Sequence, residues 1–128
     1  MPNGKKILFV GFEIRGLDFT TSDRAQLNVT EESVLAGVNA EIERVRARGY
    51  ELDVCFIHPD ATAEPAVLER LKSNRYDCVL VGAGVRTRPE ALLLFEKIIN
   101  LIHEHAPGAR ICFNKTPTDH TEAVQRWV

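Results

Sequence analysis

The stretch that decides the fold is VLVGAGVRTRPEALLLFEKI, residues 79–98. An apolar run without alternating polar residues ends in two glycines, and a helical spacing of apolar residues begins after two arginines and a proline. Strands that are buried on both faces have this composition, and they occur in parallel sheets covered by helices. The stretch therefore predicts a strand–turn–helix unit of an α/β protein.

Similar apolar runs and helical patterns alternate along the rest of the chain. Strands are predicted at residues 6–12, 51–58, 77–83 and 109–114, and helices from about residue 30 to Gly49, over 64–73, over 89–106 and in the last eleven residues. This alternation predicts one α/β domain over residues 1–128, a three-layer α-β-α arrangement around a four-stranded parallel sheet. Because crossover connections are right-handed, the favoured strand order is 2-1-3-4, the flavodoxin-like arrangement.

Composition narrows the possible partners. The chain has 128 residues, the size of one domain, with 45% hydrophobic and 27% charged residues and a net charge of -2. A balanced charge argues against nucleic-acid binding and against a polybasic membrane anchor, and no apolar run is long enough to span a bilayer. Cys55, Cys78 and Cys112 lie in strand-like runs, where cysteine acts as a small hydrophobe. These features predict a cytoplasmic protein without disulfides.

The predicted helix 89–106 has an unusually wide apolar surface. At 100° per residue, about half of its circumference is apolar, which predicts a homodimer through this helix. The alternative is that the chain's own C-terminal helix covers the same surface. At its start, Thr87 and Glu90 form a T-x-x-E capping box with Pro89 in the first turn.

The position of a ligand site follows from the strand order. In open α/β sheets, ligands bind outside the carboxyl ends of the strands, at the point between strands 1 and 3 where the connections diverge. A long connection, residues 11–29, follows strand 1, and loops of this length are often lids or binding loops. The candidate ligand-binding residues in the converging loops are Glu13, Arg15, Gly82, Gly84, Arg86, Arg88, Asn114, Lys115 and Thr116.

The basic residues among these candidates suit an anionic small molecule, a carboxylate or a phosphate, because Arg86, Arg88 and Lys115 would form a positive rim. The alternative is that the two arginines form structural ion pairs with Glu13, Asp18 or Glu90. The glycine stretch lacks the third glycine of a dinucleotide-binding loop and the Gly-Lys-Ser/Thr of a P-loop. No cofactor can be named from it.

Catalysis at the same place would use four candidates. Glu13 would act as general base, Lys115 as electrophile, and Asp119 with His120 as an acid/base pair. Three strand spacings put His58 about 14 Å from His120, too far to share a metal. No cysteine pair has zinc spacing, so we expect no metal site. No signature in the sequence singles out a reaction.

The alternation and the ending ICFNKTPTDHTEAVQRWV (111–128) resemble a receiver domain of two-component signalling, where a lysine follows a strand and precedes a proline. Only Glu13 stands where receivers have an acidic pair, and Gly82 stands where they have the phosphoacceptor aspartate, so receiver phosphotransfer is not expected. The segments DCVLVGAGVRTRPE, LLFEKIINLIHEHAP and EAVQRW are similar to a family of small stand-alone bacterial α/β proteins, and this resemblance supplies no activity. Three functions stay open: anion binding, an enzyme in the same crevice, and a pseudo-receiver interaction module.

Overall fold

The four apolar runs form the strands of a single parallel sheet. The structure, a computed structural model, describes residues 4–13, 31–116 and 118–128. The strands are β1 (Lys6–Phe12), β2 (Glu51–Ile57), β3 (Cys78–Val81) and β4 (Arg110–Phe113). They pair in the order β2-β1-β3-β4 and every pair is parallel. The predicted fold class and strand order are confirmed.

Each strand contributes to two cores because successive side chains point to opposite faces of a sheet. In β1, Leu8 and Val10 belong to the core on one face, and Ile7 and Phe9 belong to the core on the other. All four side chains are buried. This double burial is the physical reason why the strands show no alternation of polar and apolar residues in the sequence.

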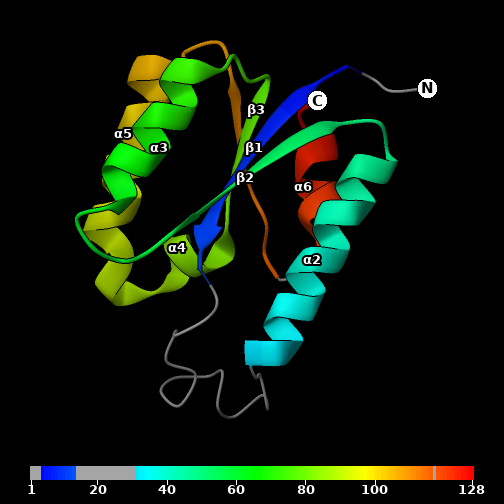
Figure 1. Cartoon of the computed structure of the whole chain (residues 1–128), viewed down its shortest axis with the longest axis horizontal. Coiled ribbons are helices and arrows are strands. Elements are labelled where there is room, and N and C mark those ends of the chain that lie inside the picture. Colours follow the sequence, from blue (N-terminus) through cyan, green and yellow to red (C-terminus); the bar gives the residue numbers. More distant parts are fainter. Residues whose placement is uncertain (1–3, 14–30, 117) are drawn as a thin grey trace.

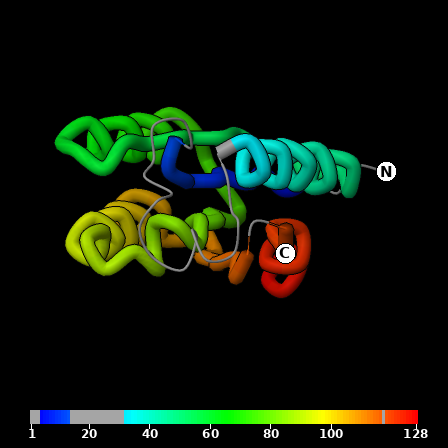
Figure 2. Tube along the Cα trace, turned by 90° about the horizontal axis from the view of Figure 1, so that it is seen from below, coloured from blue at the N-terminus to red at the C-terminus, as the bar shows by residue number. Residues whose placement is uncertain are grey.

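The helices form the two outer layers (Figure 1). Helices α3 (Ala63–Ser73) and α5 (Leu92–His105) pack on one face of the sheet, and α2 (Glu31–Ala47) and α6 (His120–Gln125) pack on the other. The end view separates the same three layers (Figure 2). The suggestion that the C-terminal helix covers α5 is therefore wrong, because α6 lies against α2 on the opposite face. Among the helices described, none has the length and apolarity that crossing a bilayer requires.

The connection from β3 to α5 differs from the prediction. Gly82 is extended and precedes a short helix, α4 (Ala83–Thr87), and a 3₁₀ segment, Pro89–Ala91, leads into α5. The Thr87 hydroxyl donates to the carbonyl of Ala83, within α4, and makes no cap for a following helix. The capping box is therefore wrong, and α5 begins at Leu92 instead of Pro89.

Most of the wide apolar surface of α5 packs inside the molecule. Ile98 and Ile102 are completely buried, and four flanking side chains pack partly buried against the same core: Leu94, Phe95, Ile99 and Leu101. Helix α3 is the neighbour of α5 in this layer. Only Leu92 and Leu93, in the first turn, are largely exposed apolar side chains of this helix. Dimerisation through α5 stays a prediction. The exposed apolar surface that supports it is smaller than the sequence suggested.

Candidate functional site

The ring of Phe9 packs against the two glycines at the carboxyl ends of β1 and β3. A Cβ atom placed on Gly11 would lie 2.9 Å from Cζ of Phe9, and one on Gly82 would lie 3.3 Å from Cε1 of the same ring. The ring also makes edge-to-face contacts with His120 and Phe56, with centroid distances of 4.8 and 6.1 Å. The two glycines therefore make room for Phe9, and this packing accounts for their presence at the strand ends.

The loops after β3 and β4 are tied together through Asn114. Its side-chain Oδ1 accepts the backbone N–H of Ala83 at 2.9 Å, and its Nδ2 donates to the carbonyl of Thr116 at 2.7 Å. Arg86 donates from Nη2 to the carbonyl of Asn114 at 3.1 Å, and its guanidinium lies 5.9 Å from the ring centre of Phe113. Asn114 is buried. The structure therefore brings three predicted site residues together: Arg86 and Thr116 each share a hydrogen bond with Asn114.

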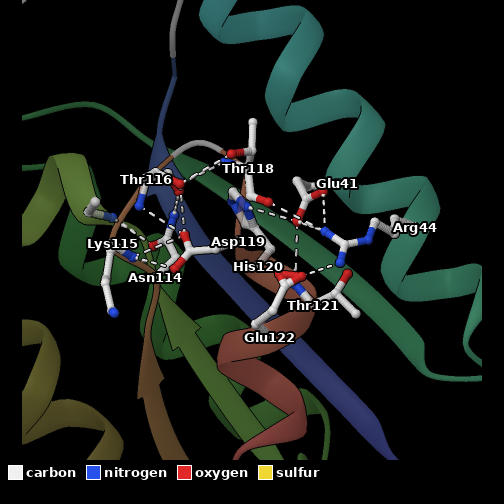
Figure 3. Close-up of polar contacts among 11 residues, drawn as sticks. Glu41, Arg44, Asn114, Lys115, Thr116, Thr118, Asp119, His120, Thr121 and Glu122 are labelled. Carbon is white, nitrogen blue, oxygen red and sulfur yellow. Dashed lines mark hydrogen bonds and ion pairs between the residues drawn. The ribbon is translucent and has the colours of Figure 1, made fainter.

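In the loop after β4, the carboxylate of Asp119 accepts the N–H groups that a bound anion would otherwise accept (Figure 3). Its carboxylate accepts the backbone N–H groups of Lys115 and Thr116 at 2.8–3.0 Å, and also the hydroxyl of Thr116. Burial alone would raise the pKa of Asp119, but these hydrogen bonds outweigh it and hold the pKa below its ordinary value. The carboxylate therefore stays ionised and fills the position of an anion within its own loop.

A charged network joins α2 to α6 at the base of the same loop. Arg44 pairs with Glu41 on its own helix and with Glu122 on α6. Glu41 is only 5% exposed, and one of its oxygens also accepts the backbone N–H of Thr121 at 3.4 Å. Arg46 donates to the carbonyl of Leu52 at 2.9 Å. These arginines of α2 therefore stabilise the packing of the protein's own elements.

His120 lies inside this interface instead of facing an open site. The side chain is 2% exposed, and both ring nitrogens lack a hydrogen-bond partner among the described residues. Its Nδ1 is 3.9 Å from Oε1 of Glu41. Burial lowers the pKa of His120 although nearby carboxylates act in the opposite direction. As a catalytic candidate, His120 is thus separated from solvent by the packing of α2 and α6.

The remaining predicted residues are distributed around the edge. Glu13 follows β1, half buried, and its backbone N–H donates to the carbonyl of Ile57 at the end of β2. Lys115 has an exposed side chain. Gly84 lies within α4. Arg15 and most of the connection 11–29 lie outside the described residues. In the described part of the chain, no group of three or more potential metal-binding side chains is found.

Arg88 lies at a different part of the same edge, in the wall of a pocket. Its side chain is 19% exposed, and its Nε donates to Glu90 at 2.9 Å. It lines a pocket of about 490 Å³ between the end of β1, the β2–α3 connection, the first turn of α3 and the start of α5, a size typical of small-molecule sites. The pocket is lined by Phe12, Pro59, Asp60, Ala61, Glu64, Arg88, Glu90, Ala91, Leu93, Leu94 and Lys97.

This pocket was not predicted as a unit. Asp60, Ala61 and Glu64 are not among the ligand-binding residues that the sequence predicts. The signal that could have found them is their position directly after a buried strand, next to strand 1 in the order 2-1-3-4.

Neither protein-family models nor curated proteins give a match to this sequence.

Proposed function

We propose that the protein binds a small organic anion with an apolar body in the pocket between the β2–α3 connection, α3 and the start of α5. The observation that carries the proposal is the side chain of Arg88, 19% exposed, in the wall of this pocket. Glu90 accepts from Nε, one of the five N–H donors of the group, and the two terminal NH₂ groups have the geometry that binds a carboxylate. The apolar side chains of Phe12 and Leu94 support the body of such a ligand.

The charges of the pocket favour a monocarboxylate over a phosphate. Three acidic residues, Asp60, Glu64 and Glu90, line it together with two basic ones, Arg88 and Lys97. Lys97 pairs with Glu64 at 3.4 Å. A ligand with two negative charges would meet like charges on several sides, which disfavours binding. A single carboxylate on Arg88 avoids this repulsion.

The rim predicted from the sequence supports ligand binding less well than this pocket. At the loop after β4, the carboxylate of Asp119 already accepts the available backbone donors, and Arg86 donates to a backbone carbonyl. The catalytic candidates Lys115, Asp119 and His120 have different surroundings: exposed, bound into a loop, and buried, respectively. We therefore favour a binding protein over an enzyme.

The three free cysteines of the protein support a reducing, cytoplasmic location.

A thermal-unfolding experiment tests the anion proposal. We expect 4-methylpentanoate to raise the melting temperature of the wild type, because a ligand that binds the native state stabilises it by mass action. The uncharged analogue 4-methyl-1-pentanol should give a smaller shift. Arg88→Gln should abolish the difference between the two compounds, whereas the control Arg75→Gln, at an exposed arginine outside the pocket, should preserve it. Equal shifts in wild type and Arg88→Gln would contradict the proposal.

Self-association is a second proposed function, favoured by one observation. Leu92 is 58% exposed in the first turn of α5, beside the exposed Leu93. Adjacent exposed leucines on a helix are a typical feature of contact surfaces. If copies of the chain associate here, light scattering should show a dimer at micromolar concentration that Leu92→Asp dissociates. Asn100→Asp, at another exposed position on the same helix, should leave the dimer intact. A monomeric wild type would rule the dimer out.

A further inference from the structure

The charges around the pocket are separated by structural element. The wall formed by the β2–α3 connection and the first turn of α3 carries Asp60 and Glu64. The wall formed by the segment before α5 and by α5 itself carries Arg88 and Lys97. Glu90 also lies on the second wall, where it accepts from Nε of Arg88. The pocket thus has an acidic side and a mainly basic side.

An ion pair joins the two walls of the pocket. Nζ of Lys97 lies 3.4 Å from Oε1 of Glu64. This ion pair shows that opposite charges meet across the pocket. Because Glu64 and Lys97 compensate each other, they are less available to a ligand than Asp60 and Arg88 are.

Asp60 keeps one carboxylate oxygen for a ligand. Both the backbone N–H and the hydroxyl of Thr62 donate to Oδ1 of Asp60. Among the described residues, no hydrogen bond reaches Oδ2. The hydrogen bond from the hydroxyl of Thr62 and, to a smaller extent, the one from its backbone N–H lower the pKa of Asp60. The carboxylate is therefore ionised at neutral pH. Asp60 therefore presents a fixed negative charge at the rim of the pocket.

We propose that the ligand of this pocket is a zwitterion, a free amino acid with a branched apolar side chain. Its carboxylate binds Arg88, its ammonium group binds Oδ2 of Asp60, and its side chain packs on the apolar residues Phe12, Ala91 and Leu94. The inference rests on the proposed function, because it assigns a ligand class to the same pocket. It explains why a site with an arginine in its wall also carries uncompensated acidic charge.

Three compounds with the same branched chain separate the charge requirements. L-leucine carries both charged groups, 4-methylpentanoate carries only the carboxylate, and 3-methylbutylamine carries only the ammonium group. Titration calorimetry on the wild type should show leucine binding at least about tenfold more tightly than either analogue, because a charge-assisted hydrogen bond contributes roughly one such factor. Equal affinities for leucine and 4-methylpentanoate would overturn the zwitterion while leaving anion binding intact.

Two variants assign the contacts. Asp60→Asn keeps an Oδ1 acceptor for Thr62 and removes the charge, so it should weaken the binding of leucine about tenfold and should not weaken the binding of 4-methylpentanoate. Arg88→Gln should weaken both compounds. If Asp60→Asn leaves the affinity for leucine unchanged, the ammonium assignment is wrong. If Asp60→Asn does not fold, the three compounds on the wild type decide alone. If none of the three compounds binds the wild type, anion binding and the zwitterion both fail.

Discussion

The Nδ1 atom of His120 lies 3.9 Å from Oε1 of Glu41, and both side chains are buried between α6 and α2. Burial lowers the pKa of His120 below its ordinary value of 6.5, against the opposing effect of Glu41, Asp119 and Glu122. The unfolded chain, which titrates near the ordinary value, then binds more protons than the folded protein below that pH. The stability present above about pH 6.5 is therefore lost as the pH falls towards the folded pKa.

We expect the free energy of urea unfolding to decrease between pH 7 and pH 5.5, by at most about 1.4 kcal/mol per pH unit from this group. In His120→Phe, the ring contact with Phe9 can be kept without a titrating group, so the decrease should be smaller. His103→Gln, at an exposed histidine, should retain the pH dependence of the wild type. Identical pH dependence in His120→Phe and wild type would contradict the assignment.

The contact between Gly11 and Phe9 should make the glycine hard to replace. In Gly11→Ala the new Cβ would lie 2.9 Å from Cζ of Phe9, and the ring is enclosed by its aromatic neighbours. We expect the free energy of unfolding to fall by about 1–3 kcal/mol. Gly108→Ala, where no atom lies within 4 Å of the added Cβ, should change it by less than about 0.5 kcal/mol.

A double-mutant cycle checks the cause. In a Phe9→Leu background, the cost of Gly11→Ala should shrink, because the ring that clashes with the added methyl group is gone. The same cost in both backgrounds would show that the ring is not responsible.

The buried hydrogen bonds of Asn114 to the backbone should contribute more to the free energy of unfolding than exposed bonds of the same kind do. Its side chain is buried and joins the loops after β3 and β4 through Ala83 and Thr116. Asn114→Ala leaves both backbone groups without these partners, and we expect a loss of about 1–3 kcal/mol in urea unfolding.

Asn100 provides the matched control for this residue. Its Nδ2 also donates to a backbone carbonyl, that of Glu96, but the group is exposed to water. Asn100→Ala should therefore change the free energy of unfolding by less than about 0.5 kcal/mol. Equal effects of the two alanine variants would show that burial of the Asn114 bonds is unimportant.

The fold was predictable because its main determinants lie in short stretches of sequence. A run such as KILFVGF can be buried on both faces only in a covered sheet, and right-handed crossovers then leave few strand orders. The start of α5 was not predictable in the same way. Thr87 and Glu90 fit a capping box in sequence, but the hydroxyl of Thr87 found an acceptor in the preceding turn, at Ala83.

The strand order predicted which loops lie next to one another, but it did not predict the contacts that their side chains make. Residues such as Asn114 and Asp119 were placed correctly at the carboxyl edge of the sheet, next to the loop after β3. Their partners depend on the backbone conformation of the loop, which brings the N–H groups of Lys115 and Thr116 to the carboxylate. The presence of Asp60 and Arg88 in the lining of one pocket depends on how α3 and α5 pack, and no local pattern encodes that packing.

Mapping 4-methylpentanoate by amide NMR on the full chain tests the central claim most directly. If the anion binds in the pocket, resonances of residues 60–64 and 88–97 should move with a common saturation curve, and those of 115–119 should stay in place. Arg88→Gln should weaken the binding, so that the same shifts need a higher concentration of the anion. Saturable shifts confined to residues 82–86 and 115–119 would place the anion at the loops after β3 and β4, and would contradict the assignment of the ligand to the pocket of Arg88.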